Sequence, residues 1–202
     1  MLTFNEDRHE YFWDGKIVPS VTKIIAPLSD YSHIQSGVME KARAEGNAIH
    51  HMVEWFEDGV LDEANLPAWM RPRLAAWKKF KAESGWETDA CEKRLYHKQF
   101  GYAGTCDLCG TAPKFPKLKG RGIVDLKRSL YDDPATGVQT AAYAEAENHM
   151  QGRHVMLINW RAGLKLNDDG RYRLHQFKSK ADWPTFLACL TVHRFKEQHG
   201  RL

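Results

Sequence analysis

The spacing of apolar side chains changes near residue 90, and this change limits the folds open to the chain more than any other feature. Ile49, Met52, Val53 and Phe56 follow the i, i+3, i+4, i+7 spacing of a helix with one buried face, which predicts a long amphipathic helix over about residues 35–57. Beyond residue 90, short β-prone segments follow one another with glycine-containing turns between them. Helices followed by consecutive strands predict an α/β (α+β) fold in which a central sheet is flanked by helices.

The other elements are predicted from the same periodicities and from turn and cap residues. A hairpin, a short helix capped by Ser20 and two longer helices precede the sheet, and a closing helix capped by Asp182 ends the chain. The predicted ranges are strands 2–4 and 11–13, helices 21–25, 35–57 and 67–84 or 72–84, strands 93–97, 102–110 and 122–127, helix 134–148, strands 153–160 and 171–177, and a helix from 182.

Length and composition favour one domain. The chain has 202 residues, of which 43% are hydrophobic, enough for a buried core and too many for a disordered chain. Without a repeat or low-complexity linker, we expect a single domain over 1–202, with a hairpin and helices in 1–85 and the sheet with its flanking helices in 86–202. No apolar run approaches the ~18 residues of a membrane span and the start is charged, which predicts a cytoplasmic protein without a membrane partner.

Basic side chains are concentrated in the second half of the chain. Residues 1–100 carry 13 basic and 16 acidic side chains, whereas residues 101–202 carry 16 basic and 10 acidic ones. The second half is therefore the half expected to face a polyanion such as nucleic acid, although an excess of this size is also ordinary surface charge.

One cluster of ionisable residues lies on the predicted sheet. Asp125 and Lys127 are i and i+2 on one strand, so both side chains face one side while Leu126 faces the core. Asp107 lies a strand and a turn earlier, which can bring its carboxylate beside that of Asp125. Two neighbouring carboxylates repel each other unless a cation lies between them, and Mg²⁺ prefers oxygen ligands. The alternative is a solvated ion pair without catalytic consequence.

Short motifs around this cluster resemble the signature of RecB-like nucleases. They occur in that family's order, G-x-x-x-H, E, G-x-x-D, D-x-K and Q-x-x-x-Y. The matching stretches are Gly46-Asn47-Ala48-Ile49-His50, Glu92, Gly104-Thr105-Cys106-Asp107, Asp125-Leu126-Lys127 and Gln139-Thr140-Ala141-Ala142-Tyr143. Together with an opening similar to that of phage-type exonucleases, they make roughly residues 10–145 resemble the PD-(D/E)XK nuclease superfamily, near its RecB and lambda-exonuclease branches. Cys106 stands where the superfamily's name has proline, and Asp125 where many members have glutamate.

The resemblance implies a restriction-endonuclease-like core and a metal-dependent site. The core is a mixed sheet in which three antiparallel strands carry the acidic residues, followed by a crossing helix and a further strand. The ligands implied for Mg²⁺ or Mn²⁺, as one ion or two, are His50, Asp107, Asp125 and the carbonyl of Leu126. Lys127 would be catalytic beside these acids, and Glu92 would support the site.

The resemblance also implies side chains that contact DNA. Gln139 and Tyr143 are i and i+4 on one face of the helix after the catalytic strand, which places them near the site and the DNA. The alternative is that this alanine-rich helix only packs. Arg128 and Ser129, directly after the D-x-K motif, are candidates for contacts to phosphate.

His50 is expected at the edge of the buried face of the long helix. Gly46, His50 and Glu54 form a stripe beside its apolar residues, so the imidazole can look toward the sheet. A glycine at position 46 costs the helix about 1 kcal/mol relative to alanine, which is easier to understand if something approaches that turn closely. The alternative is a histidine at the core edge with no ligand.

The cysteines and one missing motif limit the cofactors. Cys106 and Cys109 have a zinc-like spacing, but Cys91 and Cys189 are isolated, so we expect reduced thiols, with Cys106 a small buried hydrophobe, and no iron–sulfur cluster. The chain contains no G-x-x-x-x-G-K-[S/T] motif, so no ATP site is expected.

These features predict a divalent-metal-dependent DNA nuclease, an exonuclease of DNA recombination or processing in the cytoplasm of a bacterial or phage-infected cell. The alternatives are a structure-selective endonuclease or nickase and an inactive DNA-binding module of the same fold. DNA is the expected partner, with a single-strand annealing recombination protein and further copies of the chain in a homo-oligomer as additional candidates.

Overall fold

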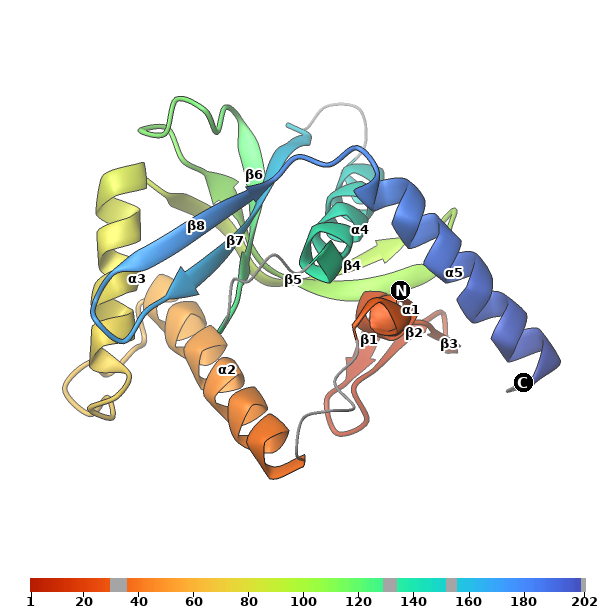
Figure 1. The fold of residues 1–202 in the computed structure, drawn as a ribbon, viewed down its shortest axis with the longest axis horizontal. Helices are drawn as coiled ribbons and strands as arrows, with labels where there is room; N and C mark the ends of the chain where they lie inside the picture. The colour runs from red at the N-terminus through yellow and green to blue at the C-terminus, as the bar shows by residue number, and fades with distance from the viewer. Residues whose placement is uncertain (30–35, 129–133, 152–155, 201–202) are drawn as a thin grey trace.

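The computed structural model describes residues 1–29, 36–128, 134–151 and 156–200. They form a five-stranded sheet and a smaller three-stranded sheet, with helices around them (Figure 1). The elements are β1 (Leu2–Asn5), β2 (Glu10–Trp13), β3 (Lys16–Val18), α1 (Val21–Ile25), the 3₁₀ helix η1 (Ala26–Leu28), α2 (Ser36–Glu57), α3 (Arg71–Ser84), β4 (Glu87–His97), β5 (Tyr102–Thr111), β6 (Arg121–Leu126), α4 (Pro134–Met150), β7 (Ile158–Leu166), β8 (Tyr172–Phe177) and α5 (Asp182–His199). The predicted α+β class is confirmed.

The central sheet is mixed and has the strand order β4-β5-β6-β7-β8. The first three strands are antiparallel neighbours, β7 pairs parallel with β6, and β8 returns antiparallel to β7. A parallel pair needs a long crossover, and α4 supplies it between β6 and β7. Three antiparallel strands, a crossing helix and a further strand are the order that the family resemblance implied.

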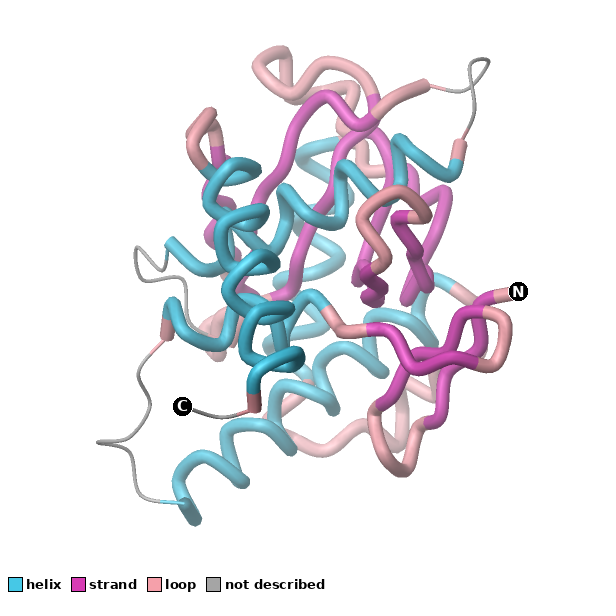
Figure 2. Tube along the Cα trace, turned by 90° about the vertical axis from the view of Figure 1, so that its right-hand side faces the viewer, coloured by secondary structure: helices cyan, strands magenta, loops and turns pink. Residues whose placement is uncertain are grey.

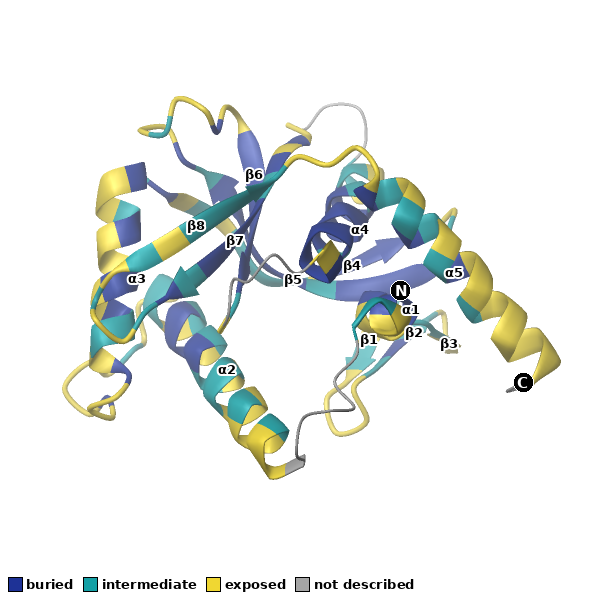
Figure 3. Ribbon diagram, viewed as in Figure 1, coloured by how far each residue is buried: buried dark blue, intermediate teal, exposed yellow. Residues whose placement is uncertain are grey.

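Helices lie on both sides of the central sheet (Figures 1 and 2). Successive residues of β6 point to opposite sides, so Ile123 packs in a core with α1, α4 and α5, whereas Val124 and Leu126 pack in a core with α2 and α3. Figure 3 shows that buried residues are concentrated in the sheet and on the inner sides of the helices. The sheet therefore carries a core on each face.

Helix α2 buries the predicted apolar stripe. Ile49, Met52 and Val53 are buried and Phe56 is partly buried, in the core that also holds Trp77 of α3. The opposite side of α2 is exposed (Figure 3) and is polar apart from Val38 and Trp55. Among the described helices, none is long and apolar enough to cross a membrane.

One of the two predicted helix caps is confirmed. Ser20 precedes α1, and its hydroxyl accepts a hydrogen bond from the backbone N–H of Lys23 at 3.2 Å. The prediction that Asp182 caps the closing helix is wrong, because the N-cap residue is Ala181 and Asp182 is the first helical residue. Its carboxylate instead accepts a charge-assisted hydrogen bond from Arg161 at 2.9 Å, a stronger partner than a backbone N–H.

The strand predicted over 153–160 is placed later in the chain. Residues 153–155 lie outside the described part, and β7 runs from Ile158 to Leu166. The side-chain carbonyl of Asn148 accepts a hydrogen bond from the N–H of Ile158 at 2.8 Å, where the strand begins. Every second residue of β7 from Ile158 to Leu166 is buried, and the residues between them are exposed or half-buried except Gly163. The prediction followed the apolar run before this strand and not the alternation within it.

A third N-terminal strand was not predicted. Asp14 and Gly15 have positive φ values of 47° and 77°, which is the backbone of a tight hairpin turn. The turn reverses the chain after β2, so that β3 pairs antiparallel with it. The predicted hairpin therefore continues through the Asp14-Gly15 turn into a third strand.

Cys106 is a buried side chain, as predicted. It packs with Cys109 in the core under α4, and their sulfur atoms are 3.6 Å apart. Cys91 and Cys189 are only partly buried, and among the described residues the four thiols do not form one cluster.

Packing between β6 and β7 gives a test of the sheet. A Cβ atom added to Gly122 would lie 2.1 Å from the indole of Trp160, whose Nε1 donates a hydrogen bond to Gly120 O at 3.0 Å and cannot move away freely. Gly122→Ala should therefore lower the free energy of unfolding by about 1–3 kcal/mol, measured from urea midpoints. Gly37→Ala is the control, because no described atom lies within 4 Å of a Cβ there. A wild-type midpoint for Gly122→Ala would show that this contact is wrong.

Candidate functional site

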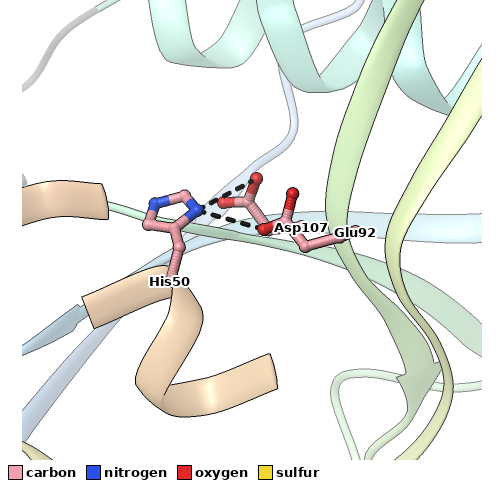
Figure 4. Close-up of side chains that lie close together, drawn as sticks. All are labelled: His50, Glu92 and Asp107. Carbon is pink, nitrogen blue, oxygen red and sulfur yellow. Dashed lines mark hydrogen bonds and ion pairs between the residues drawn. The ribbon is translucent and has the colours of Figure 1, made fainter. Parts of the chain in front are cut away.

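Three side chains from distant parts of the chain meet where β4 and β5 pass α2. The strand register pairs Cys91 with Leu108 and Lys93 with Cys106, which places Glu92 opposite Asp107. His50 projects from α2 toward both carboxylates (Figure 4), with Nδ1 at 3.3 Å from Glu92 Oε1 and 3.6 Å from Asp107 Oδ1.

The backbone of Glu92 is unusual. Its φ of 45° lies in the left-handed region, which non-glycine residues adopt only at an energetic cost. Such conformations persist where the surrounding structure holds them, and they concentrate at functional sites.

The imidazole of His50 faces oxygen acceptors on both sides. Its Nε2 lies 3.2 Å from the carbonyl oxygen of Leu126, while Nδ1 faces the two carboxylates. Burial lowers the pKa of His50, but the charges of Asp107 and Glu92 outweigh it and raise this pKa to about 9. A neutral imidazole carries only one N–H, so a second proton or another cation must lie between Nδ1 and the carboxylates.

Asp107 is buried and surrounded by like charges. Burial, together with the charges of Asp125 and Glu92, raises the pKa of Asp107 to about 7 against the opposing effect of His50 and Lys127. Its Oδ2 accepts a hydrogen bond from the backbone N–H of Leu126 at 2.6 Å, which fixes the carboxylate toward the end of β6.

This donor set fits a divalent cation. His50, Glu92 and Asp107 offer one nitrogen and two carboxylate oxygens, all within 4.8 Å of one another. Two positive charges would offset both carboxylates, and such mixed ligands suit Mn²⁺ as well as Mg²⁺. The carbonyl of Leu126 would accept the other N–H of His50, which is how metal-bound histidines are usually oriented. Among the described residues, His50, Glu92 and Asp107 form the one group of at least three histidine, cysteine or acidic side chains that could hold a metal ion.

A second chain of polar contacts begins beside this group. Asp125 Oδ2 and Lys127 Nζ are 2.8 Å apart, on one side of β6 as predicted. Lys127 Nζ donates a hydrogen bond to Gln139 Oε1 at 3.0 Å, and Gln139 Nε2 donates one to the hydroxyl of Tyr143 at 2.9 Å. Gln139 and Tyr143 of α4, which the resemblance assigned to DNA contact, are thus part of the hydrogen-bonded chain that holds Lys127.

The structure brings the motif residues together but divides them differently from the prediction. Glu92, expected to support the site, lies in the three-residue group, whereas the carboxylate of Asp125 pairs with Lys127. The carbonyl of Leu126, expected as a ligand, faces His50. The side chain of Arg128 is half exposed and donates a hydrogen bond to Glu45 at 3.0 Å. Ser129 lies outside the described residues.

Gly104 has a physical reason to be glycine. A Cβ atom there would lie 2.6 Å from the ring of Tyr143. The glycine of the G-x-x-D stretch therefore makes room for the tyrosine of the Q-x-x-x-Y stretch, which links two motifs that are far apart in the sequence.

Tyr11 is a neighbour of the site that the sequence analysis did not select. Its buried hydroxyl lies 2.7 Å from Thr105 Oγ1. Burial raises the pKa of Tyr11, and the charges of Glu92 and Asp107 raise it further, so the phenol is protonated at neutral pH. No spacing rule could find it, because β2 is brought to β5 only by tertiary packing.

Comparison with known proteins does not assign a family. No protein-family model and no curated protein matches this chain. The functional argument therefore depends on the motifs and on the geometry that brings them together.

Removal of His50 should weaken binding of a divalent cation. We expect His50→Ala to lower the affinity for Mn²⁺ at least about tenfold in calorimetric titration, because one of three ligands is lost. His51→Ala is the matched control, since that side chain is exposed and contacts Glu54. Equal affinities for the two variants would exclude His50 as a ligand.

Binding of the cation should also depend on pH. The pKa values of about 9 for His50 and about 7 for Asp107 mean that protons must leave the site before Mn²⁺ binds. Affinity should rise from pH 6 to pH 8, with proton release visible as a buffer-dependent binding enthalpy. In Asp107→Asn the remaining affinity should change less over this range, and an affinity independent of pH in the wild type would contradict the assignment.

Proposed function

We propose that this chain is a divalent-metal-dependent DNA nuclease of the PD-(D/E)XK type, acting as an exonuclease. The observation that supports it best is the convergence of His50, Glu92 and Asp107 beside the Asp125–Lys127 pair. These residues come from α2, from three strands and from the position directly after β6, and each belongs to a motif of the resemblance. The exonuclease assignment depends on the resemblance of the opening stretch to phage-type exonucleases.

The reaction requires stabilisation of negative charge at a phosphodiester. A divalent ion held by His50, Glu92 and Asp107 would supply Lewis acidity toward the phosphoryl oxygens. The ammonium of Lys127 adds a fixed positive charge beside this group, and Asp125 and Gln139 hold it there. Because it is positioned before the substrate arrives, it stabilises developing charge without reorganisation.

A shallow recess beside the site offers a place for the DNA backbone. Gly46, His50, Lys127 and Arg128 are among the residues that line it. No described atom lies within 4 Å of a Cβ added to Gly46, so packing within the described chain does not explain a glycine inside this helix. A sugar-phosphate backbone that approaches α2 at this turn would explain it.

Cleavage should depend on Lys127 while cation binding does not. We expect Lys127→Ala to reduce the rate of DNA hydrolysis about 10²-fold or more, because a preorganised charge is lost. Its affinity for Mn²⁺ should stay near that of the wild type, because an ammonium group has no lone pair for a metal. Lys98→Ala, an exposed lysine in the β4–β5 turn, is the control.

The same assay decides between the modes of action. Linear duplex, linear single-stranded and covalently closed circular DNA are incubated with Mg²⁺, Mn²⁺ or EDTA. Degradation of linear DNA alone supports the exonuclease, and cutting of circles would show an endonuclease. Binding without cleavage by the wild type under all metal conditions would overturn the proposed function.

Gly46→Ala separates substrate approach from folding. Alanine favours the helix by up to about 1 kcal/mol, so the variant should be at least as stable as the wild type. Its KM for DNA should nevertheless rise by about tenfold or more, because the methyl group displaces the substrate from its reactive position. Gly37→Ala makes the same change on the same helix away from the recess and should leave KM unchanged. An unaltered KM for Gly46→Ala would show that DNA does not pass there.

A further inference from the structure

A groove in the described part of the molecule is separate from the candidate active site. It has a volume of about 470 Å³ and lies between α4, β7, β8 and the start of α5. Glu145 and Asn148 of α4 line it, whereas Gln139 and Tyr143 of the same helix hold Lys127. Glu145 follows Tyr143 by two positions, which is roughly 200° around a helix, so the groove and the site lie on opposite flanks of α4.

One wall of the groove is positively charged. Lys178 and Lys180 lie in the exposed connection between β8 and α5 (Figure 3), and within the described chain neither has an ion pair or hydrogen bond. Arg161 also lines the groove. Glu145 is the one acidic residue of the lining, so the groove has an excess of positive charge.

The connection that carries the lysines is braced. Arg161 donates hydrogen bonds to Ser179 O at 3.4 Å, to Asp182 at 2.9 Å and to Gly137 O at 2.6 Å. The hydroxyl of Ser179 accepts a hydrogen bond from the N–H of Ala181 at 3.2 Å. The two ammonium groups therefore extend from a loop whose backbone is already positioned.

Aromatic and amide side chains complete the lining. Trp183 is half-buried, and it stacks on Phe186 with ring centroids 5.5 Å apart and planes at 12°. This fixes its indole at the wall of the groove. Asn159 and Gln176 offer amide donors and acceptors of the kind that pair with the edges of bases.

We infer that this groove binds a nucleotide unit of single-stranded nucleic acid. Lysines contact the phosphates, Trp183 offers a stacking surface and the amides face the base, which is the combination that holds single strands with little sequence preference. The volume of about 470 Å³ suits one nucleotide-sized ligand. This inference rests on the proposed function, because the bound strand would belong to the DNA substrate. The groove would hold that strand away from the site of cleavage.

Binding can be measured without cleavage. A fluorescein-labelled twelve-residue oligothymidylate is titrated in EDTA with the wild type, with Lys178→Ala/Lys180→Ala and with the control Lys117→Ala/Lys119→Ala. The control removes two exposed lysines of the same spacing from the β5–β6 connection. We expect the groove variant to bind about tenfold more weakly and its salt dependence, the slope of log K against log salt, to fall by about 1.4, whereas the control resembles the wild type.

Two further ligands identify the chemistry and the source. An abasic oligomer of equal length should bind the wild type about tenfold more weakly, because stacking is lost. If thymidine monophosphate competes fully at the oligomer's own concentration, the groove binds a free nucleotide. This result would overturn the inference that it binds a single strand. Poly-glutamate that competes as well as the oligomer would show charge attraction only.

The outcomes separate this inference from the proposed function. If the wild type cleaves DNA but the groove variant binds like the wild type, the groove inference is wrong and the nuclease stands. If no DNA is cleaved but the groove variant loses binding, the inference stands without the nuclease. Absence of oligomer binding by the wild type overturns the inference.

Discussion

Repulsion among carboxylates at one end of the central sheet is the constraint on which the site depends. The register of β4, β5 and β6 places Asp107 between Glu92 and Asp125, and Asp107 is buried, so its pKa rises to about 7. Such an arrangement is stable only if positive charge lies beside it. His50 of α2 supplies positive charge toward Glu92 and Asp107, and Lys127, directly after β6, supplies it toward Asp125. A divalent cation would also supply this positive charge, and His50 and Asp107 would then be deprotonated.

A second buried charge cluster holds α4 in place at a distance from the site. Glu147 is fully buried, and it accepts hydrogen bonds from Lys93 of β4 and Arg121 of β6, each at 2.7 Å. Burial raises the pKa of Glu147, but these partners outweigh it and keep the carboxylate charged. The cluster ties the C-terminal part of α4 to two strands of the sheet. The N-terminal part of the same helix can then hold Lys127 through Gln139.

The motif residues divide into those that meet a ligand and those that position others. Gly104 makes room for the ring of Tyr143, Tyr143 accepts a hydrogen bond from Gln139, and Gln139 accepts one from Lys127. Residues that are separated in the chain are thus coupled in one set of contacts. Gly46 differs, since no described neighbour requires it, and this contrast is why it supports a substrate contact.

The sequence by itself determined the α+β class, the helix with the Ile49 stripe and the common side of Asp125 and Lys127, because periodicities of 3.6 and 2 depend only on local backbone geometry. The prediction placed β7 too early, because an apolar run before Ile158 was taken as the strand although the period of two begins at Ile158. Only the tertiary structure decided that Glu92 faces His50, that Asp125 pairs with Lys127 and that Asp182 pairs with Arg161. Except for Asp125 and Lys127, the two residues of each pair are far apart in the chain. Which charges pair depends on which side chains the packed elements bring within a few ångströms of one another, and local sequence patterns do not contain this information.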